Sequence, residues 1–260
     1  MTGVQRRPPE AESVANRIFR LLDAFSQARP ALTLSELSRA SGLPLSTTHR
    51  MVADLTRWGA LQRRDDGAYH VGLRLWELGS LTPGSLRLRE NAMPFMEDLC
   101  TATQQNVQLA VLDGREALSI ERLAARGAVT MATRTGSRLP LHASGVGLVL
   151  LAHADPEFQE RVLASPLHRY TERTNTSPVR LRELLADTRR DGYVISVQQI
   201  ELISRSIAAP VRDADGSVIA ALSVVVPVEG VDVRTLVPAV RATALGISRS
   251  LGAPIAGRGG

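Results

Sequence analysis

The most constraining feature of this sequence is a pair of amphipathic helical patterns joined by only a few residues, in TLSELSRASGLPLSTTHRMVADLTRWG. The first pattern starts with Thr33 and Glu36, which have the spacing of a capping box, and it stops at Gly42. The second pattern starts at Pro44, which the first turn of a helix tolerates, and it stops at Gly59. Two helices joined so closely have to pack at an angle, which predicts a helix-turn-helix.

The second of these helices is expected to have one buried side and one exposed polar side. Its buried positions recur at helical spacing and are Thr48, Met51, Val52 and Leu55. Its outward side chains are then Ser46, Thr47, His49, Arg50 and Arg57. A helix-turn-helix places such side chains in the major groove of DNA, where Ser and Thr contact bases or phosphates and Arg recognises guanine. A helix face that is merely exposed to solvent carries the same residue types. The pattern of this helix taken by itself therefore leaves open whether the face binds DNA.

A basic hairpin is predicted to follow. Asp66 and Gly67 favour a tight turn between two short strands, and Arg63 and Arg64 precede that turn. Such a hairpin lies along the DNA backbone and positions the module without selecting a sequence. With an amphipathic helix from residue 14, the order is helix, helix, helix, hairpin. A further helix is expected from residue 73 to the breaker at 82–85, where we place a domain boundary.

Composition limits the class of protein. All 31 basic residues are Arg, so every solvated basic position has to be Arg, and their number alone says little about function. Residues 1–80 nevertheless hold 11 Arg against 8 acidic residues, an excess that suits a polyanion. The single Cys, Cys100, excludes an internal disulfide and a Cys-based zinc cluster. No apolar run reaches the length of a membrane span, so we expect a soluble, cytoplasmic protein without membrane partner or cofactor.

The rest of the chain mixes helical and strand patterns. Helices are expected near residues 87–103, 144–154, 156–164, 178–190 and 237–251. Strands are expected at residues 106–112, 115–123, 129–136, 193–200, 206–212 and 217–227. Tight turns at 113–114 and 213–216 join neighbouring strands, which predicts an antiparallel sheet flanked by helices and hence an α+β fold class. The polar tails at 1–12 and 255–260 are expected to be disordered.

Longer stretches of the chain match the pattern of one family. TLSELSRASGLPLSTTHRMVADLTRWGAL resembles the winged helix-turn-helix of IclR-family transcriptional regulators, and GAYHVGLRLWELGS resembles the wing end and linker helix of that family. GSRLPLHASGVGLVLLA, LADTRRDGY and RSIAAPVRDADGSVIAALSVVVP resemble its effector-binding domain. The resemblance covers about residues 13–252. It implies a DNA-binding domain at 13–72, a linker helix at 73–84 and a GAF-like effector domain at 85–254.

The same resemblance implies a function. Members of the family are homodimers or dimers of dimers that bind a double-stranded DNA operator, more often as repressors, and a small organic acid changes that binding. Family members that bind small carboxylates use a pocket whose matching positions here are Met131, Gly145, Val146, Ser206 and Ser223. The N–H groups of Gly145 and Val146 at a helix start suit an anion, and a glycine lets a ligand approach the backbone closely.

This sequence departs from the family at four positions of that region. Ser196, Gln199 and Ile203 stand where the family often has an acid, Glu and Gly, and Val225 stands in place of a second serine. The pocket thereby loses a charge and gains apolar wall at Ser196 and Val225, which favours a bulkier or more aromatic acid. Buried packing without a ligand is the alternative role for each of these residues.

Two arginines, Arg134 and Arg205, are candidates to pair with the carboxylate of the acid, because a guanidinium binds a carboxylate through two parallel hydrogen bonds. A solvated surface position is the alternative for both residues.

Two other functions are weighed against regulation. His142 and Ser144 supply a base and a nucleophile, but G-x-S-x-G is absent and no acid lies nearby in the sequence, so we expect no enzyme. The five His show no metal-binding spacing, so no metal site is expected. A GAF-like signalling or interaction module without specific DNA binding is the remaining alternative, and it would not need the exposed helix face.

Overall fold

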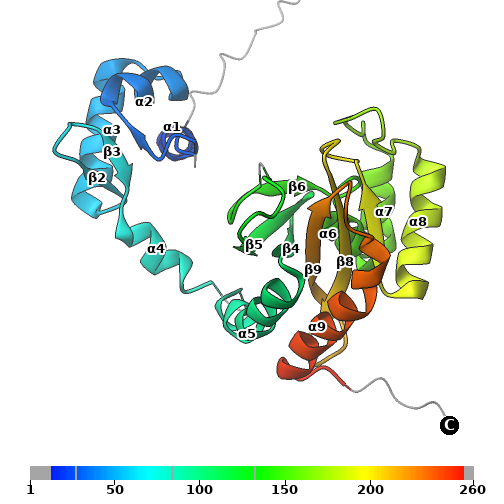
Figure 1. The fold of residues 1–260 in the computed structure, drawn as a ribbon. Helices are drawn as coiled ribbons and strands as arrows, with labels where there is room; N and C mark the ends of the chain where they lie inside the picture. The colour runs from blue at the N-terminus through cyan, green and yellow to red at the C-terminus, as the bar shows by residue number, and fades with distance from the viewer. Residues whose placement is uncertain (1–12, 27, 83–84, 132, 255–260) are drawn as a thin grey trace, which may run out of the picture. The chain divides into compact units, whose positions relative to one another are not determined.

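The structure is a computed structural model that describes residues 13–26, 28–82, 85–131 and 133–254 (Figure 1). Internal contacts divide the chain into two units, Met1–Pro83 and Gly84–Gly260, each with its own hydrophobic core. The predicted tails at 1–12 and 255–260 lie outside the described residues. Within the described part, no helix is both long and apolar enough to cross a membrane.

The described part of the N-terminal unit combines helices with a small antiparallel sheet. The helices are α1 (Val14–Asp23), α2 (Leu34–Ser41), α3 (Leu45–Trp58) and α4 (Leu73–Gly79). The strands are β1 (Ala31–Leu32), β2 (Leu61–Arg63) and β3 (Tyr69–Val71), in the order β1-β3-β2. The predicted order of three helices and a hairpin is confirmed. The sequence did not predict β1, which has only two residues and pairs with β3 almost forty residues later.

Local signals placed these elements correctly. The Thr33 backbone N–H donates to Glu36 Oε2 at 2.8 Å, and the Glu36 N–H donates to Thr33 Oγ1 at 3.3 Å, so the capping box is present. Gly42 and Gly59 end α2 and α3 with positive φ angles of 67° and 88°. Helix α4 ends at Gly79, before the predicted end at the 82–85 breaker, because Ser80 and the two residues after it form tight turns.

The core of the N-terminal unit confirms the buried side of α3. Thr48, Met51, Val52 and Leu55 are all buried. They pack with Leu21, Leu37 and Leu61 of the neighbouring elements. The opposite side of α3 is therefore free to contact another molecule.

The C-terminal unit is built on a six-stranded antiparallel sheet with the order β6-β5-β4-β9-β8-β7. The strands are β4 (Asn106–Asp113), β5 (Glu116–Leu123), β6 (Arg138–Pro140), β7 (Val194–Val197), β8 (Ser204–Arg212) and β9 (Val218–Pro227). Helices α5 (Ser85–Thr103) and α9 (Val237–Ser250) pack on one face. Helix α6 (Gly145–His153) packs on the other face, with α7 (Pro156–Leu163) and α8 (Pro178–Asp191) outside it (Figure 1). The predicted α+β class is confirmed.

Successive side chains of β9 point to opposite faces of the sheet, and both faces are covered by helices. Leu222 and Val224 join the core beneath α5 and α9, whereas Ala221 lies in the core beneath α6. Ser223 and Val225 are also buried on the α6 face. A strand buried on both sides reads as a continuous apolar run, as the sequence SVIAALSVVVP does.

The strand predicted at residues 129–136 is wrong. The described residues of this segment form no strand, and the short strand β6 lies after it, at Arg138–Pro140. Side chains take the place of a neighbouring strand, because Asn106 Nδ2 donates to the Val129 carbonyl at 2.8 Å and Arg122 Nη1 donates to the Thr133 carbonyl at 2.7 Å. Backbone carbonyls can accept hydrogen bonds either from a neighbouring strand or from side chains, and an alternating sequence pattern does not distinguish the two.

We predict that Gly72→Ala destabilises the N-terminal unit. A Cβ at Gly72 would lie 2.1 Å from the carbonyl oxygen of Gly59, a backbone atom that cannot rotate away. The expected loss is about 2 kcal/mol of the free energy of unfolding, the usual scale for overpacking. Urea unfolding followed by tryptophan fluorescence measures it, because Trp58 and Trp76 both belong to this unit.

Gly79→Ala is the matched control, since a Cβ there meets no atom within 4 Å. It should leave the unfolding midpoint unchanged or raise it slightly, because Ala favours a helix. Equal midpoints for the two variants would contradict the proposed clash at Gly72.

Candidate functional site

The exposed face of α3 carries the polar residues predicted from the sequence. Ser46, His49, Arg50 and Arg57 are exposed, and Thr47 is half-buried. Arg57 is not free, because its Nη1 donates to Asp54 Oδ1 at 2.8 Å on the same helix. The side chains of His49 and Arg50 make no hydrogen bond or ion pair with any described residue, so the Arg50 guanidinium is a positive group of this face without an acidic partner.

The hairpin after α3 presents the other predicted arginines. Gly67 makes the turn with a φ of 83°. The Arg63 guanidinium lies 5.9 Å from the centre of the Tyr69 ring, and Arg64 Nε lies 3.4 Å from Asp66 Oδ2. Both side chains are exposed, so the hairpin presents a basic edge that can contact phosphates.

The C-terminal unit contains a pocket between the α6 face of the sheet and the start of α6. Its lining includes all seven residues predicted to contact an effector: Met131, Gly145, Val146, Ser196, Ser206, Ser223 and Val225. The cavity has a volume of about 60 Å³ and opens to solvent at its mouth. The structure thus brings together residues from four strands or loops and one helix.

The start of α6 supplies backbone donors to this pocket. Ser144 caps the helix by accepting from the Gly147 N–H at 3.0 Å. The N–H groups of Gly145 and Val146, the next two along the helix, have no acceptor among the described residues. With the helix dipole behind them, these two groups can bind a carboxylate.

The glycine at the start of α6 leaves room for β8. A Cβ at Gly145 would lie 2.6 Å from Ser206 Oγ and 3.4 Å from Ala208 Cβ, so the missing side chain makes room for the Ser206 hydroxyl. That it also lets a ligand approach the backbone stays a prediction. Gly147 is equally restricted, because its Cβ would lie 2.5 Å from the Pro140 carbonyl oxygen. Both glycines hold the helix start against its neighbours.

Two rows of cross-strand partners form the floor of the pocket. One row runs across the sheet through Asn106, Val225, Ser206 and Ser196. The other runs through Gln108, Ser223 and Ala208. Paired residues in neighbouring strands point to the same face, so both rows face α6. Val225 places an apolar surface between the polar groups of the first row.

The predicted residues differ in whether their side chains line the pocket and whether they already have hydrogen-bond partners. Ser196 Oγ donates to the Ala143 carbonyl at 2.9 Å and so fixes the backbone just before α6. Arg205 lines the pocket, and its Nη2 donates to the Val231 carbonyl. Arg134 and Ile203 are exposed and are not among the residues that line the pocket. Arg205 alternates with Ser206 along β8, so its side chain points to the opposite face of the sheet, and neither candidate arginine directs its guanidinium into this pocket.

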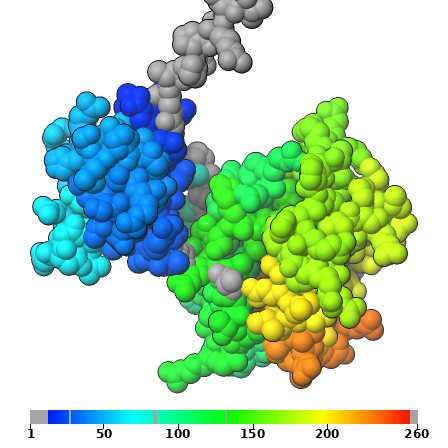
Figure 2. Space-filling view, turned by 90° about the horizontal axis from the view of Figure 1, so that it is seen from above, coloured from blue at the N-terminus to red at the C-terminus, as the bar shows by residue number. Residues whose placement is uncertain are grey.

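The mouth of the pocket is formed by two loops. Residues 198–201 line it from one side, and Met131 and Thr133 line it from the other. Figure 2 shows these segments side by side, the yellow surface near residue 200 next to the green surface near residue 130. Gln198 adopts a positive φ of 56°, which a non-glycine residue rarely does.

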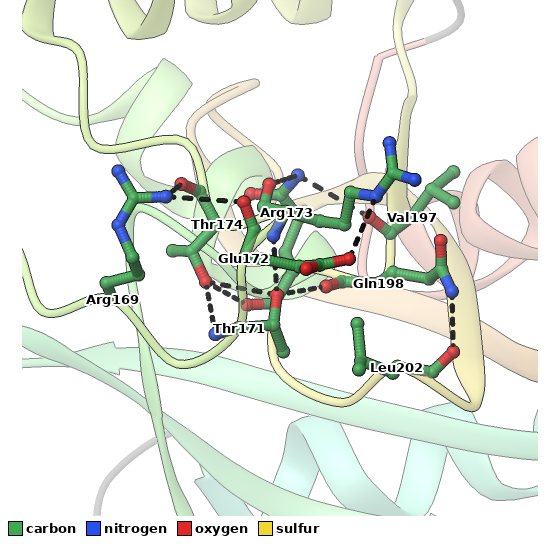
Figure 3. Close-up of polar contacts among 9 residues, drawn as sticks. Arg169, Thr171, Glu172, Arg173, Thr174, Val197, Gln198 and Leu202 are labelled. Carbon is green, nitrogen blue, oxygen red and sulfur yellow. Dashed lines mark hydrogen bonds and ion pairs between the residues drawn. The ribbon is translucent and has the colours of Figure 1, made fainter.

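A second loop holds residues 198–199 in place (Figure 3). Thr171 Oγ1 donates to the Gln198 carbonyl at 2.6 Å, and Thr174 Oγ1 donates to the Gln199 carbonyl at 2.7 Å. The Gln199 side chain accepts from the Asn175 N–H at 2.6 Å. Gln199 therefore contributes to the mouth chiefly by anchoring it.

Several polar residues of the pocket were not predicted from the sequence, Gln108 and Thr133 among them. Gln108 is 2 % exposed and lies between the buried Val107 and Leu109 of β4. A signal was present, because NVQLAVL alternates polar and apolar residues although the strand is buried on both faces. Polar side chains in such a strand need partners, which marks them as candidate site residues.

His142 and Ser144 are engaged structurally. His142 Nε2 lies 2.9 Å from the His168 carbonyl oxygen, and burial lowers the pKa of the imidazole. Ser144 Oγ donates to the Pro140 carbonyl at 2.8 Å while it caps α6. Among the described residues, no group of three or more His, Cys, Asp or Glu is placed to hold a metal ion.

Comparison with known proteins identifies both units. Residues 14–65 match the model of the IclR helix-turn-helix domain, and residues 82–249 match that of the bacterial transcriptional regulator IclR C-terminal domain. The chain belongs to the IclR family of transcriptional regulators. It is 32% identical to the HTH-type transcriptional regulator XynR of Escherichia coli K12 over 251 residues, which are 95% of this chain and 99% of XynR.

Other relatives agree. The transcriptional repressor IclR of Escherichia coli K12 is 32% identical over 82% of this chain and 79% of its own. An IclR homologue from Microbacterium hydrocarbonoxydans, crystallised with 4-hydroxybenzoate, is 43% identical, has a TM-score of 0.87, and matches over 92% of this chain and 99% of its own. As a family member, this IclR-type chain is a DNA-binding transcriptional regulator whose GAF-like C-terminal domain binds a small-molecule effector.

A buried and a half-buried histidine give a testable pH dependence. Burial lowers the pKa of His142 and of His153, whose Nδ1 lies 2.9 Å from the Val149 carbonyl oxygen. The unfolded chain therefore binds protons on them at a higher pH than the folded chain does. Their contribution to stability is complete above the ordinary His pKa of about 6.5 and is lost as the pH falls below it.

We predict that the free energy of unfolding falls between pH 7.5 and pH 5.5, and that His142→Gln and His153→Gln each reduce this fall. Urea unfolding at the two pH values measures it. The exposed His49→Gln is the control and should keep the wild-type dependence. A dependence that neither the His142 nor the His153 variant reduces would rule out this origin.

Proposed function

We propose that this regulator binds its operator through the exposed face of α3 and the basic hairpin, and that a small aromatic carboxylic acid in the pocket changes that binding. The observation that carries the effector class is the pocket itself. It places unpaired N–H groups of Gly145 and Val146 at one end and the apolar Val225 on its floor. An acid with an apolar ring fits such an arrangement, and the homologue crystallised with 4-hydroxybenzoate supports this class.

The α3 residues differ in their proposed roles. Arg50 is exposed and without an acidic partner, so it is the main candidate to contact a base. Ser46, Thr47 and His49 flank it as further contacts, whereas the pairing of Arg57 with Asp54 suits a weaker phosphate contact. Arg63 and Arg64 contact phosphates beside the groove. The alternative of a module without specific DNA binding is disfavoured by the match of residues 14–65 to a helix-turn-helix.

We further propose a two-fold dimer that represses transcription. Leu73, Trp76 and Leu81 are about 70% exposed, an apolar surface that a second copy would cover. Repression is supported by the relatives that are named repressors. A dimer presents two α3 helices to a pseudo-palindromic site, whose half-sites are then about one helical turn apart or a multiple of it. Because its partner is DNA, we place the protein in the cytoplasm.

We predict that Arg50→Ala reduces specific DNA binding at least tenfold, because a bidentate contact with guanine contributes about 1–3 kcal/mol. The probe is a duplex selected from a random-sequence pool with the wild-type chain. Fluorescence anisotropy at fixed salt gives the Kd, and light scattering of the complex gives the number of chains per duplex, expected to be two or four.

The controls use arginines with other proposed roles. Arg57→Ala should cost less than Arg50→Ala, because its guanidinium is shared with Asp54. Arg63→Ala and Arg64→Ala should weaken binding to selected and unselected duplexes alike and each reduce the salt slope by about one. Wild-type affinity in Arg50→Ala would show that another face recognises the bases, and a single chain per duplex would exclude the dimer.

For the effector, we predict that 4-hydroxybenzoate raises the thermal midpoint of the full chain and changes its affinity for the selected duplex. The amide 4-hydroxybenzamide should bind at least tenfold more weakly, because hydrogen bonds to a charged group contribute about 1.5–3 kcal/mol. Acetate, which lacks a ring, should bind weakly as well. Equal binding of acid and amide would exclude the helix start as an anion site, and no binding of either would exclude this effector class.

A further inference from the structure

Two residues that line the effector pocket carry a polar atom without a hydrogen-bond partner in the described structure. These atoms are Gln108 Nε2 and Thr133 Oγ1. Both atoms are buried, and Gln108 as a whole is only 2 % exposed. A buried polar atom without a partner costs free energy, and native proteins keep few of them without a reason. Their meeting in one pocket indicates polar groups on the ligand.

Gln108 differs in this respect from Asn106, its neighbour on the same strand. Asn106 lies two residues earlier on β4 and faces the same side of the sheet. Its Nδ2 donates to the Val129 carbonyl at 2.8 Å, and its Oδ1 accepts from Arg122 Nη2 at 3.1 Å. Asn106 therefore holds the wall of the pocket, whereas the Gln108 amide N–H group is not used by the fold.

The register of the sheet places Gln108 at the end of the pocket opposite the start of α6. Gln108 pairs with Ser223 on β9, and Ser223 pairs with Ala208 on β8. Ala208 lies 3.4 Å from where a Gly145 Cβ would be, so the helix start sits above β8. Gln108 is two strands away from it, about 10 Å at the usual strand spacing. A ligand that reaches both must carry polar groups at its two ends.

We propose that Gln108 is a specificity-determining residue that recognises a hydroxyl at the end of the effector opposite its carboxylate, with Thr133 as a second partner of that hydroxyl. This rests on the proposed function, in which the carboxylate binds at Gly145 and Val146. The ligand class is then an aromatic acid with a hydroxyl in the para position, because a ring holds para substituents on opposite sides.

The polar groups around Gln108 suit a hydroxyl. Gln108 pairs with Ser223 on β9 and with Arg122 on β5, and Arg122 already donates to the Thr133 carbonyl and to Asn106 Oδ1. A hydroxyl both donates and accepts, so it can bond the Gln108 amide and the Thr133 hydroxyl at the same time.

The test is isothermal titration calorimetry of the full chain with 4-hydroxybenzoate and with benzoate, which lacks the hydroxyl. Wild type should bind 4-hydroxybenzoate at least tenfold more tightly, because benzoate leaves the buried amide unpaired. Gln108→Leu should reduce the preference to about twofold or less, mainly by weaker binding of 4-hydroxybenzoate. Thr133→Val should reduce it in part.

Stability distinguishes recognition from a structural role. The ligand-free Gln108→Leu chain should have a Tm equal to or above that of wild type, because a leucine replaces an N–H group that has no partner. A clear fall in Tm would assign Gln108 to the fold and overturn the proposal. Gln105→Leu is the matched control, since this half-buried glutamine precedes the same strand but does not line the pocket. It should keep the wild-type preference.

Other outcomes separate this proposal from the function on which it rests. If wild type binds both acids with equal affinity, or Gln108→Leu keeps the full preference, Gln108 does not select the hydroxyl although the aromatic-acid effector stands. If neither acid binds the wild-type chain, the proposed effector class fails, and the role of Gln108 fails with it.

Discussion

The close approach of α6 to the sheet determines whether this effector domain has a pocket at all. The first turn of α6 lies close to β8, because a Cβ at residue 145 would be 2.6 Å from Ser206 Oγ. Ser196 holds the residue before the helix, and Ser144 caps it. Held in this way, two N–H groups face a cavity rather than protein. A side chain at 145 would require the Ser206 hydroxyl to move.

Sequence patterns predicted the elements whose causes are local. The buried stripe of α3, the capping box at Thr33 and the turns at 66–67 and 113–114 each depend on residues a few positions apart, and all are present. The strand at 129–136 failed because Asn106 and Arg122, distant in sequence, bond its carbonyls. Gln108 was missed for a related reason. Whether a buried amide has a partner depends on elements that no local window contains.

The arginines illustrate the same limit. In a chain without Lys, sequence alone cannot rank them, because each is an equally good candidate for a charged contact. The structure ranks them by their neighbours. Asp54 partly neutralises Arg57 and Asp66 lies near Arg64, while Arg50 keeps its charge for another molecule. Short-range ion pairs, rather than the count of basic residues, therefore set the pattern of positive charge that a polyanion meets.

Strand β4 separates two tasks that proteins often combine in one residue. Asn106 carries the hydrogen bonds that hold the pocket wall, and Gln108, two positions later on the same face, carries none that the fold requires. Selection for a new effector can thus change residue 108 while residue 106 preserves the shape of the cavity. The arrangement makes ligand preference evolvable, since a regulator of this kind can acquire a new signal by single substitutions without first losing its fold.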